Sequence, residues 1–581
     1  MATHNKSDVL KGVKITSVTN MGAGVCRAPD GRVVFVYGAV DGDMVDVKIT
    51  RQKRSYFEGV IETLIEPSPY RQISDCTAFT AGCGGCMFRH ISYEHELTLK
   101  REHVASAFAR VGIRATPDAV KTAGEFAPRC KFTVPVMPDG TTGYYKRASK
   151  KIVPSDTCPL HGEADKLRVF ATDYMRRVGG ASGVHHIYVR RAGGTGEMSL
   201  ALLCSTVPAW ADDFARCAME AFPSLRGVFA RTVAADAAYN DASDDISDGA
   251  SGNYSQSSRN KGASVKNSAS VGENGGYILL KGEPYITDIL LGCRFRISPA
   301  SFYQVNHDGA EILYKTAAEL INLRDGETLL DLYCGTGTVG ISVIKASRVE
   351  AHLIGVEITP EAVADARENA KMNGVRADFI CGDASEGVGN ADNDNESDSG
   401  DDASANSRGN FIITVSSSDE FTHSEDETSI LAHTNNTASQ TVNSILLSSN
   451  SNINTSSPKT VKIRADAVII NPPRSGCGEE LARKIAAAGP SRVVYISCNP
   501  NTLARDAAAF VAAGYVIKCI VPVDMFPRTG HVETVVLMSR ENSMKSGNPD
   551  TLRFFTLMDF ILTKQKQHFF TSWEQVNKCP I

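Results

Sequence analysis

The chain has 581 residues, 42% of them hydrophobic and 22% charged, which is typical of a globular protein with two to four domains. Residues 1–10 lack the apolar core of a signal peptide, and the apolar stretch at 554–562 is too short to span a bilayer. We therefore expect a cytoplasmic protein that spans no membrane. Its 15 cysteines should be metal ligands, nucleophiles or buried thiols rather than disulfides.

The net charge of −5 conceals two acidic segments. Residues 386–460 carry a net charge of −10 and residues 236–275 one of −3, which leaves +8 on the remainder. Residues 1–151 contain 22 Lys and Arg against 15 Asp and Glu. A basic body with acidic inserts suits a polyanionic partner such as RNA, although a solvated charged surface would show the same balance.

In chain order, residues 8–66 alternate short β-rich runs with Gly and Asp turns, which predicts a small β-barrel. Arg51, Lys53 and Arg54 lie beside Tyr56 and Phe57. Such a mixture of charge and aromatic rings can hold single-stranded RNA, and a plain charged hairpin is the alternative.

Residues 69–290 are predicted to form a central, mixed α/β domain that begins with a cysteine cluster. Cys76, Cys83 and Cys86 follow a C-x6-C-x2-C pattern, and Cys158 comes later. Four thiolates at this spacing can bind zinc or an iron–sulfur cluster. The pattern is not the C-x3-C-x2-C of radical S-adenosylmethionine enzymes, so radical chemistry is not expected.

Two polar segments, about 236–275 and about 387–458, have too little apolar content to form a core and are predicted to be disordered inserts. Within the second, the apolar patch 411–415 could pair locally. Around them, residues 291–541 alternate strand and helix patterns, which predicts a doubly wound, Rossmann-like parallel sheet. The tail, 542–581, has no assignment.

The first strand of this block runs into a glycine-rich turn, LLDLYCGTGTVG at 329–340. Glycines allow a ligand close to the backbone, and the following helix offers free N–H groups. Glu357 ends the next strand, where a carboxylate can bind a ribose diol, and Asp383 ends the third. The turn also fits the G-x-G-x-x-G fingerprint of dinucleotide-binding domains. Asp331 before the turn and the Gly382-Asp383 pair after the third strand favour S-adenosylmethionine over a dinucleotide as the ligand.

Further strands end in residues with reactive side chains. Asn471-Pro-Pro-Arg474 resembles the motif of enzymes that methylate exocyclic amines, which usually have an aromatic residue where this chain has Arg474. Cys498 follows another strand and precedes Asn-Pro, and Glu533 begins an otherwise apolar strand. A buried structural thiol and a structural ion pair are the alternatives for these two residues.

A single chemistry connects Cys498 and Glu533. Carbon 5 of uracil is too weak a nucleophile to attack a methyl sulfonium directly. A thiolate that adds to carbon 6 creates an enolate that can attack, and a base must then remove the proton from carbon 5. The reaction also requires the uracil to leave its stack.

Five motifs carry a strong resemblance to the bacterial 23S rRNA (uracil-5-)-methyltransferases, the iron–sulfur, TRAM-domain branch of the RNA m5U methyltransferase family. The resemblance covers about 8–233, 276–385 and 461–541. The motifs are SPASFYQVN (298–306), DLYCGTGT (331–338), INPPRSG (470–476), SCNPNTLARD (497–506) and FPRTGHVE (526–533).

The resemblance implies an enzyme that methylates carbon 5 of a uridine in 23S rRNA, with Cys498 as nucleophile and Glu533 as base. We expect it to be a monomer. It implies a TRAM domain at 8–66 and a [4Fe–4S] cluster, rather than zinc, on Cys76, Cys83, Cys86 and Cys158. The residues that it places around S-adenosylmethionine are Gln304, Tyr333, Thr338, Glu357, Asp383 and Asn471. The family commonly has Asp at position 471, so this chain replaces a charge with a neutral amide. Methylation of an amino group or of a tRNA uridine, and RNA binding without catalysis, are the competing functions.

Overall fold

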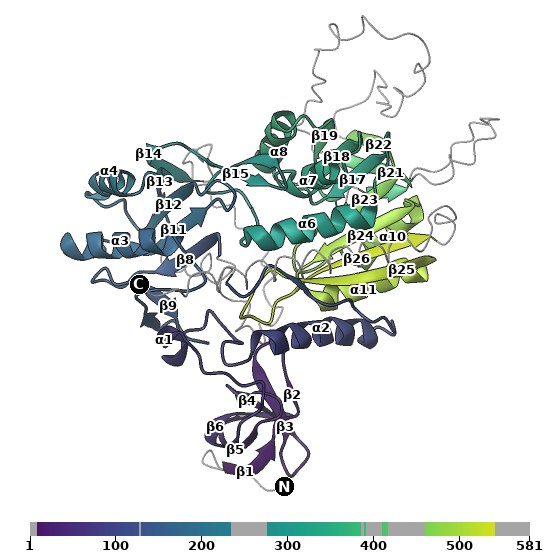
Figure 1. The fold of residues 1–581 in the computed structure, drawn as a ribbon. Coiled ribbons are helices and arrows are strands. Elements are labelled where there is room, and N and C mark those ends of the chain that lie inside the picture. The colour runs from purple at the N-terminus through teal and green to yellow at the C-terminus, as the bar shows by residue number, and fades with distance from the viewer. Residues whose placement is uncertain are drawn as a thin grey trace, which may run out of the picture.

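The computed structural model describes residues 9–126, 129–233, 276–384, 388–390, 409–415 and 459–540. The predicted insert at 236–275, most of the one at 387–458 and the tail at 542–581 lie outside these residues. Three large sheets organise the described chain (Figure 1). No helix in the described ranges is long and apolar enough to cross a membrane.

The N-terminal sheet has six strands and confirms the predicted small β domain. Alternating Val45, Val47 and Ile49 point into its core, as a period of two requires. Strand β3 has a weak β pattern in the sequence, because its Ala and Gly residues have low β propensity. In the sheet order β1-β5-β6-β4-β3-β2, the strands are β1 (Val9–Lys14), β2 (Ser17–Val18), β3 (Ala23–Arg27), β4 (Val33–Tyr37), β5 (Met44–Gln52) and β6 (Tyr56–Glu66).

The central part contains a five-stranded sheet of order β14-β13-β12-β11-β8, with α3 and α4 packed on it. Its main elements are α1 (Thr77–Thr80), β8 (Lys131–Pro135), α3 (Ala164–Arg177), β11 (Val184–Arg191), β12 (Met198–Cys204), α4 (Ala211–Ala221), β13 (Leu225–Thr232) and β14 (Tyr277–Gly282). Two hairpins accompany them, β9 (Gly143–Tyr145) with β10 (Ile152–Pro154), and β15 (Ile286–Leu290) with β16 (Cys293–Ile297).

The third sheet has eight strands in the order β19-β18-β17-β23-β24-β26-β25-β7. Strands β19 to β24 are parallel and β26 is antiparallel to both its neighbours, which confirms the predicted doubly wound architecture. The strands are β7 (Lys121–Thr122), β17 (Thr328–Leu332), β18 (His352–Glu357), β19 (Ala377–Cys381), β23 (Ala467–Ile470), β24 (Arg492–Ser497), β25 (Tyr515–Asp524) and β26 (Glu533–Arg540).

Helices cover both faces of this sheet because successive strand residues point to opposite sides: Leu329 lies in one core and Leu330 in the other. One face carries α6 (His307–Ile321), α7 (Thr338–Ser347) and α8 (Pro360–Met372). The other carries α2 (Tyr93–Arg110), α10 (Glu479–Ala488) and α11 (Pro500–Ala512).

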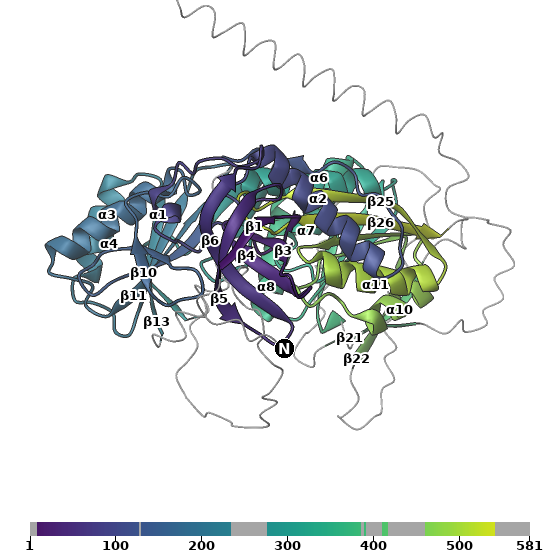
Figure 2. The ribbon, with the colours of Figure 1, turned by 90° about the horizontal axis from the view of Figure 1, so that it is seen from below.

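Helix α2 and strand β7 fall within the range expected for the central domain, but β7 is an edge strand of the eight-stranded sheet and α2 packs on one face of it. Val104 and Phe108 of α2 are fully buried in the same core as α10 and α11. Figure 1 shows α2 between the β1–β6 domain and strands β25 and β26. Figure 2 shows that domain from below, between the α3–α4 side and the α10–α11 side of the molecule.

A small sheet of β20 (Val388–Asn390), β21 (Gly409–Val415) and β22 (Lys459–Ala465) flanks α10. The segment 409–415 therefore pairs with a strand, although it falls within the insert predicted to be disordered. Phe411 and Ile413 are fully buried, so the apolar alternation of this patch supplies a packed face.

Candidate active site

The glycine-rich turn after β17 has the backbone shape that its sequence predicts. Gly335 and Gly337 have φ angles of 54° and 76°, and Tyr333 has the same left-handed conformation at 63°. This region is costly for a residue with a side chain, so the surroundings must hold Tyr333 in place. The buried Asp331 carboxylate accepts a hydrogen bond of 2.9 Å from the backbone N–H of Gly340 and so joins the strand to α7.

Glu357 ends β18 and turns its carboxylate toward this turn. One oxygen accepts a hydrogen bond of 3.1 Å from the N–H of Gly335 and the other one of 3.0 Å from the N–H of Thr359. Asp383 follows β19, the next strand of the sheet. Glu357, Asp383 and the turn thus meet at the carboxyl ends of neighbouring parallel strands, where ligands bind in this architecture.

Sequence reasoning missed Tyr314, which connects two of the predicted cofactor residues. Tyr314 is a buried residue of α6; burial raises the pKa of its hydroxyl, and Gln304 and Thr338 are close enough to that hydroxyl to oppose part of the rise. The only sequence signal was a tyrosine on the apolar face of a helix, and such residues are usually plain core.

The pairing of β24 with β26 brings Cys498 and Glu533 together. Ser497 pairs with Thr534 in this antiparallel register. Cys498 follows Ser497 and Glu533 precedes Thr534, so the two residues lie opposite each other at the edge of the sheet. Glu533 is the first residue of β26 and is buried, whereas Cys498 is half-buried.

Electrostatic coupling agrees with this proximity. Burial, and then the carboxylate of Glu533, raise the pKa of the Cys498 thiol to about 12, against a hydrogen bond and the positive charge of Arg474. Burial raises the pKa of Glu533 to about 7, and Arg474 opposes this shift too. A carboxyl group with this pKa can exchange a proton near neutrality.

Asn471 and Arg474 belong to the loop after β23, beside the Cys498 turn. The carbonyl oxygen of Arg474 accepts hydrogen bonds from the side chains of Asn499 at 3.2 Å and Thr502 at 3.1 Å, both just beyond Cys498. The N–H of Asn471 donates to the carbonyl of Leu332, next to Tyr333, at 3.3 Å. The Asn-Pro-Pro-Arg loop therefore connects the glycine-rich turn with the turn that carries Cys498.

The loop between β25 and β26, residues 525–532, carries the last motif and contacts two distant parts of the chain. The carbonyl of Arg528 accepts hydrogen bonds from the N–H groups of Met87, at 2.8 Å, and Phe88, at 3.1 Å. A Cβ atom at Gly530 would overlap the carbonyl oxygen of Asn20, in the N-terminal domain, so only glycine fits there. Burial lowers the pKa of His531 to about 3, so its ring is neutral at physiological pH.

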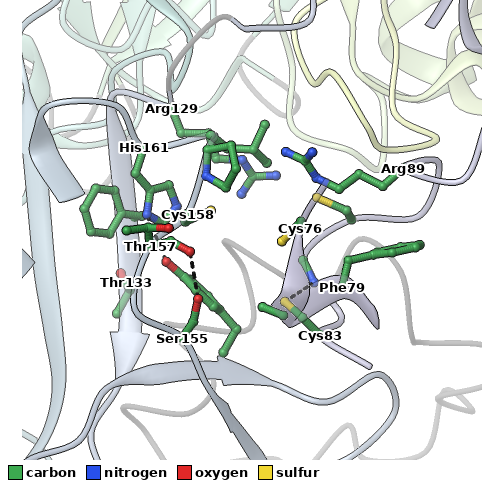
Figure 3. A pocket seen from close by; sticks show the side chains of 17 residues that line it. Cys76, Phe79, Cys83, Arg89, Arg129, Thr133, Ser155, Thr157, Cys158 and His161 are labelled. Carbon is green, nitrogen blue, oxygen red and sulfur yellow. Dashed lines mark hydrogen bonds between the residues drawn. The ribbon is translucent and has the colours of Figure 1, made fainter. Parts of the chain in front are cut away.

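The four cysteines of the predicted cluster line one pocket between α1 and the segment before α3 (Figure 3). Cys76 and Cys83 face Cys158 across it, and Arg89, Arg129 and His161 complete the wall. The N–H of Gly85 donates to the sulfur of Cys83 at 3.4 Å. Among the residues that the structure describes, no three His, Cys, Asp or Glu side chains form a closed metal-binding group, so the thiols share a pocket without the geometry of a ligand set.

Comparison with known proteins gives three family matches. Residues 11–61 match the TRAM domain, residues 323–430 a methyltransferase domain, and residues 459–541 the tRNA (uracil-5-)-methyltransferase family. The last of these regions contains Asn471, Cys498 and Glu533.

Relatives and solved structures agree with these matches. An uncharacterized RNA methyltransferase of Halalkalibacterium halodurans is 29% identical over 93% of this chain and 98% of its own, and one of Gloeobacter violaceus is 28% identical over 91% and 96%. The Pyrococcus abyssi tRNA (uracil-54, C5)-methyltransferase, solved with S-adenosyl-L-homocysteine, superposes with a TM-score of 0.57 at 20% identity, over 91% of this chain and 100% of that one. An N-terminal TRAM domain and a Rossmann-like methyltransferase fold are thus established.

Proposed function

We propose that this chain, which carries the TRAM domain and the uracil-5-methyltransferase region of the RNA m5U methyltransferase family, transfers a methyl group from S-adenosylmethionine to carbon 5 of a uridine in 23S rRNA. The observation that carries the proposal is the strand register that sets Cys498 beside Glu533. Both residues lie at the sheet edge that also holds the glycine-rich turn.

In the proposed reaction the Cys498 sulfur, as thiolate, forms a bond to carbon 6 of the uracil. The electron pair displaced from the C5–C6 double bond lets carbon 5 take the methyl group, and S-adenosylhomocysteine leaves. Glu533 then accepts the carbon 5 proton, the double bond re-forms and the C6–S bond breaks. Arg474 is the positive charge that favours the thiolate, because it opposes the rise in the pKa of Cys498.

Gln304, Tyr333, Thr338, Glu357, Asp383 and Asn471 would bind the methyl donor. Glu357 has the position to bind the ribose diol, since its strand ends beside the Gly335 turn. Tyr314 would hold Gln304 and Thr338 in a fixed relation. The TRAM domain would bind RNA, because Arg51 on β5 and Tyr56 on β6 offer the charge and the ring surface that hold unpaired nucleotides.

Nucleoside mapping tests the proposal. The purified enzyme with S-adenosylmethionine should form 5-methyluridine in 23S rRNA transcripts, at one or a few positions found by mass spectrometry. Bulk tRNA should remain unmodified in a parallel reaction. Methylation of tRNA alone would show that the substrate is tRNA and not 23S rRNA. A methylated exocyclic amine would refute the assignment of carbon 5 of uracil as the target.

For the cysteine pocket we propose a [4Fe–4S] cluster held by Cys76, Cys83, Cys86 and Cys158. The support for this proposal is the type and placement of the donors: four thiols line one pocket, and a backbone N–H points at one sulfur. Arg89 and Arg129 would offset the negative charge of a thiolate-bound cluster. The cluster would serve as a structural element and take no part in methyl transfer.

The anaerobically purified protein should be brown, contain about four iron atoms per chain and lose its visible absorption on reduction. Cys158→Ala should lose most of the iron. Cys217→Ser should keep it, because Cys217 lies on α4 and outside the pocket. A colourless protein with one equivalent of zinc would replace the iron–sulfur proposal with a zinc site.

A further inference from the structure

A cluster of buried charges links α2 to the strand and loop that lead to Glu533. Lys100 is 1% exposed, Glu96 0% and Asp524 1%. The Lys100 ammonium donates to Glu96 and to Asp524, both at 2.7 Å, and to the carbonyl of Phe526 at 3.1 Å. All three of its donors are therefore used, and two of the acceptors lie more than 400 residues away in sequence.

Asp524 ends β25, one residue after the cross-strand partner of Glu533. Its second oxygen accepts a hydrogen bond of 2.7 Å from the Tyr93 hydroxyl, and its first also accepts the N–H of Phe526 at 3.1 Å. Each oxygen of Asp524 thus has a donor, and one of those donors belongs to the β25–β26 loop itself.

Arg528 fixes the middle of the same loop. Its φ angle is 69°, a left-handed conformation that a residue with a side chain keeps only when its neighbours hold it. Its backbone N–H donates to Glu96 at 2.7 Å, and its buried guanidinium donates to the carbonyl of Ile91 at 2.8 Å and pairs with Glu125. Arg528 therefore connects the loop to the start of α2 and to the segment before β8.

A purely stabilising role would be served as well by apolar side chains, because burying ion pairs costs solvation that their attraction only repays with good geometry. The charged groups add directed contacts with the loop: Lys100 donates to the carbonyl of Phe526, and Asp524 and Glu96 accept the backbone N–H groups of Phe526 and Arg528. Glu533, the proposed base, follows this loop and must reach a proton bound to carbon. Proton removal from carbon requires an accurately placed carboxylate, so a small displacement of the loop would slow it.

We propose that Glu96, Lys100, Asp524 and Arg528 form a positioning cluster for Glu533, which holds the β25–β26 loop so that the carboxylate meets the carbon 5 proton. The inference rests on the proposed function and adds to it that α2, outside the sheet, controls the proton-removal step. Loss of the cluster should slow the release of the enzyme from methylated RNA more than it slows formation of the C6–S bond.

The test uses the full chain with Glu96→Gln, Lys100→Met and Asp524→Asn combined, so that no charge is left unpaired. Two quantities are measured: the rate of 5-methyluridine formation, and the amount of denaturant-stable protein–RNA complex formed with ordinary RNA and with 5-fluorouridine RNA. Fluorine at carbon 5 cannot be removed as a proton, so the fluorinated RNA reports C6–S bond formation and methyl transfer without the proton-removal step.

We expect product formation to fall about tenfold or more, the complex with ordinary RNA to accumulate, and the rate of trapping by 5-fluorouridine RNA to change by less than about threefold. The single variant Lys100→Arg keeps the positive charge and both carboxylates, so its rate of product formation should lie between those of the triple variant and the wild type. Glu102→Gln, an exposed charge change on the same helix, should behave like the wild type.

Product formation at the wild-type rate in the triple variant would overturn the inference, as would an equal fall in both rates, which means a role in folding alone. If the triple variant does not fold, Tyr93→Phe decides, because it removes one hydrogen bond to Asp524 and no charge. Tyr93→Phe should accumulate the denaturant-stable complex with ordinary RNA, in a smaller amount than expected for the triple variant. If it accumulates no complex, the proposed positioning role of the cluster is wrong. A wild-type enzyme that neither methylates uridine nor is trapped would instead refute the proposed function.

Discussion

Replacement of Cys498 by alanine should lower the rate of 5-methyluridine formation by about 10⁴-fold or more, because in the proposed reaction carbon 5 becomes a strong nucleophile only after the thiolate has added to carbon 6. The denaturant-stable complex with 5-fluorouridine RNA should disappear. Affinity for S-adenosylmethionine, measured by calorimetry, should stay within about threefold of the wild type, since the residues proposed to bind S-adenosylmethionine are unchanged.

Cys519→Ala is the matched control for this variant. Cys519 is also a half-buried thiol with a pKa that burial raises, to about 11, and it lies on β25 away from the 474 and 498 loops. This variant should retain activity. Near wild-type methylation by Cys498→Ala would exclude covalent catalysis through this residue.

Replacement of Glu533 by glutamine should separate the two halves of the reaction. The amide has the shape of the carboxyl group but cannot accept the carbon 5 proton, so 5-methyluridine release should fall by about 10²–10⁴-fold. Methylated RNA should remain bonded to Cys498, where denaturing electrophoresis and mass spectrometry will detect it. Free product at the wild-type rate would remove Glu533 from the mechanism.

The pH dependence of the wild type follows from the pKa of about 7 that burial gives Glu533. Only the ionised carboxylate accepts a proton, so the rate of product release should rise as pH increases through about 7. That inflection should vanish in Glu533→Gln. The thiol of Cys498, with a pKa of about 12, should add a further rise toward alkaline pH in the rate of bond formation.

The raised pKa of Glu533 also makes the stability of the folded protein depend on pH. The pKa of Glu533 is raised on folding from about 4.5 to about 7, so the folded state binds an extra proton between these values and stability falls as pH rises through that window. Above about pH 7 the buried carboxylate costs on the order of 3 kcal/mol. Glu533→Gln should therefore melt at a higher temperature than the wild type at pH 8, and at a similar one near pH 4.

The strands and the reactive residues could be predicted from the sequence because each motif directly follows or begins a strand with a clear apolar pattern. Parallel strands then bring their carboxyl ends to one edge whatever the loops do, so Tyr333, Glu357 and Asp383 had to be neighbours. The antiparallel placement of β26, which sets Glu533 beside Cys498, is a property of the sheet order and no local pattern reveals it.

Long-range side-chain contacts could not be predicted. Lys100 and Glu96 look like an ordinary exposed i, i+4 pair on a helix, and only the third partner, Asp524, shows that they are buried. Tyr314 likewise has meaning only through Gln304 and Thr338, which reach it from other elements. Residues 69–290 were assigned to the central domain as one block, because the amino acids of α2 do not tell which sheet the helix packs on.

The contact between Gly530 and Asn20 bears on how truncated proteins should be interpreted. The TRAM domain contacts the loop that precedes Glu533, the proposed base, so its deletion would uncover that loop as well as remove the proposed RNA-binding surface. A shortened enzyme that methylates poorly would then be ambiguous between weak capture of the substrate and a displaced base. Point changes at exposed residues of the domain, such as Arg51→Ala, would weaken capture and leave the contact between Gly530 and Asn20 in place, so they are the better way to measure what the domain contributes.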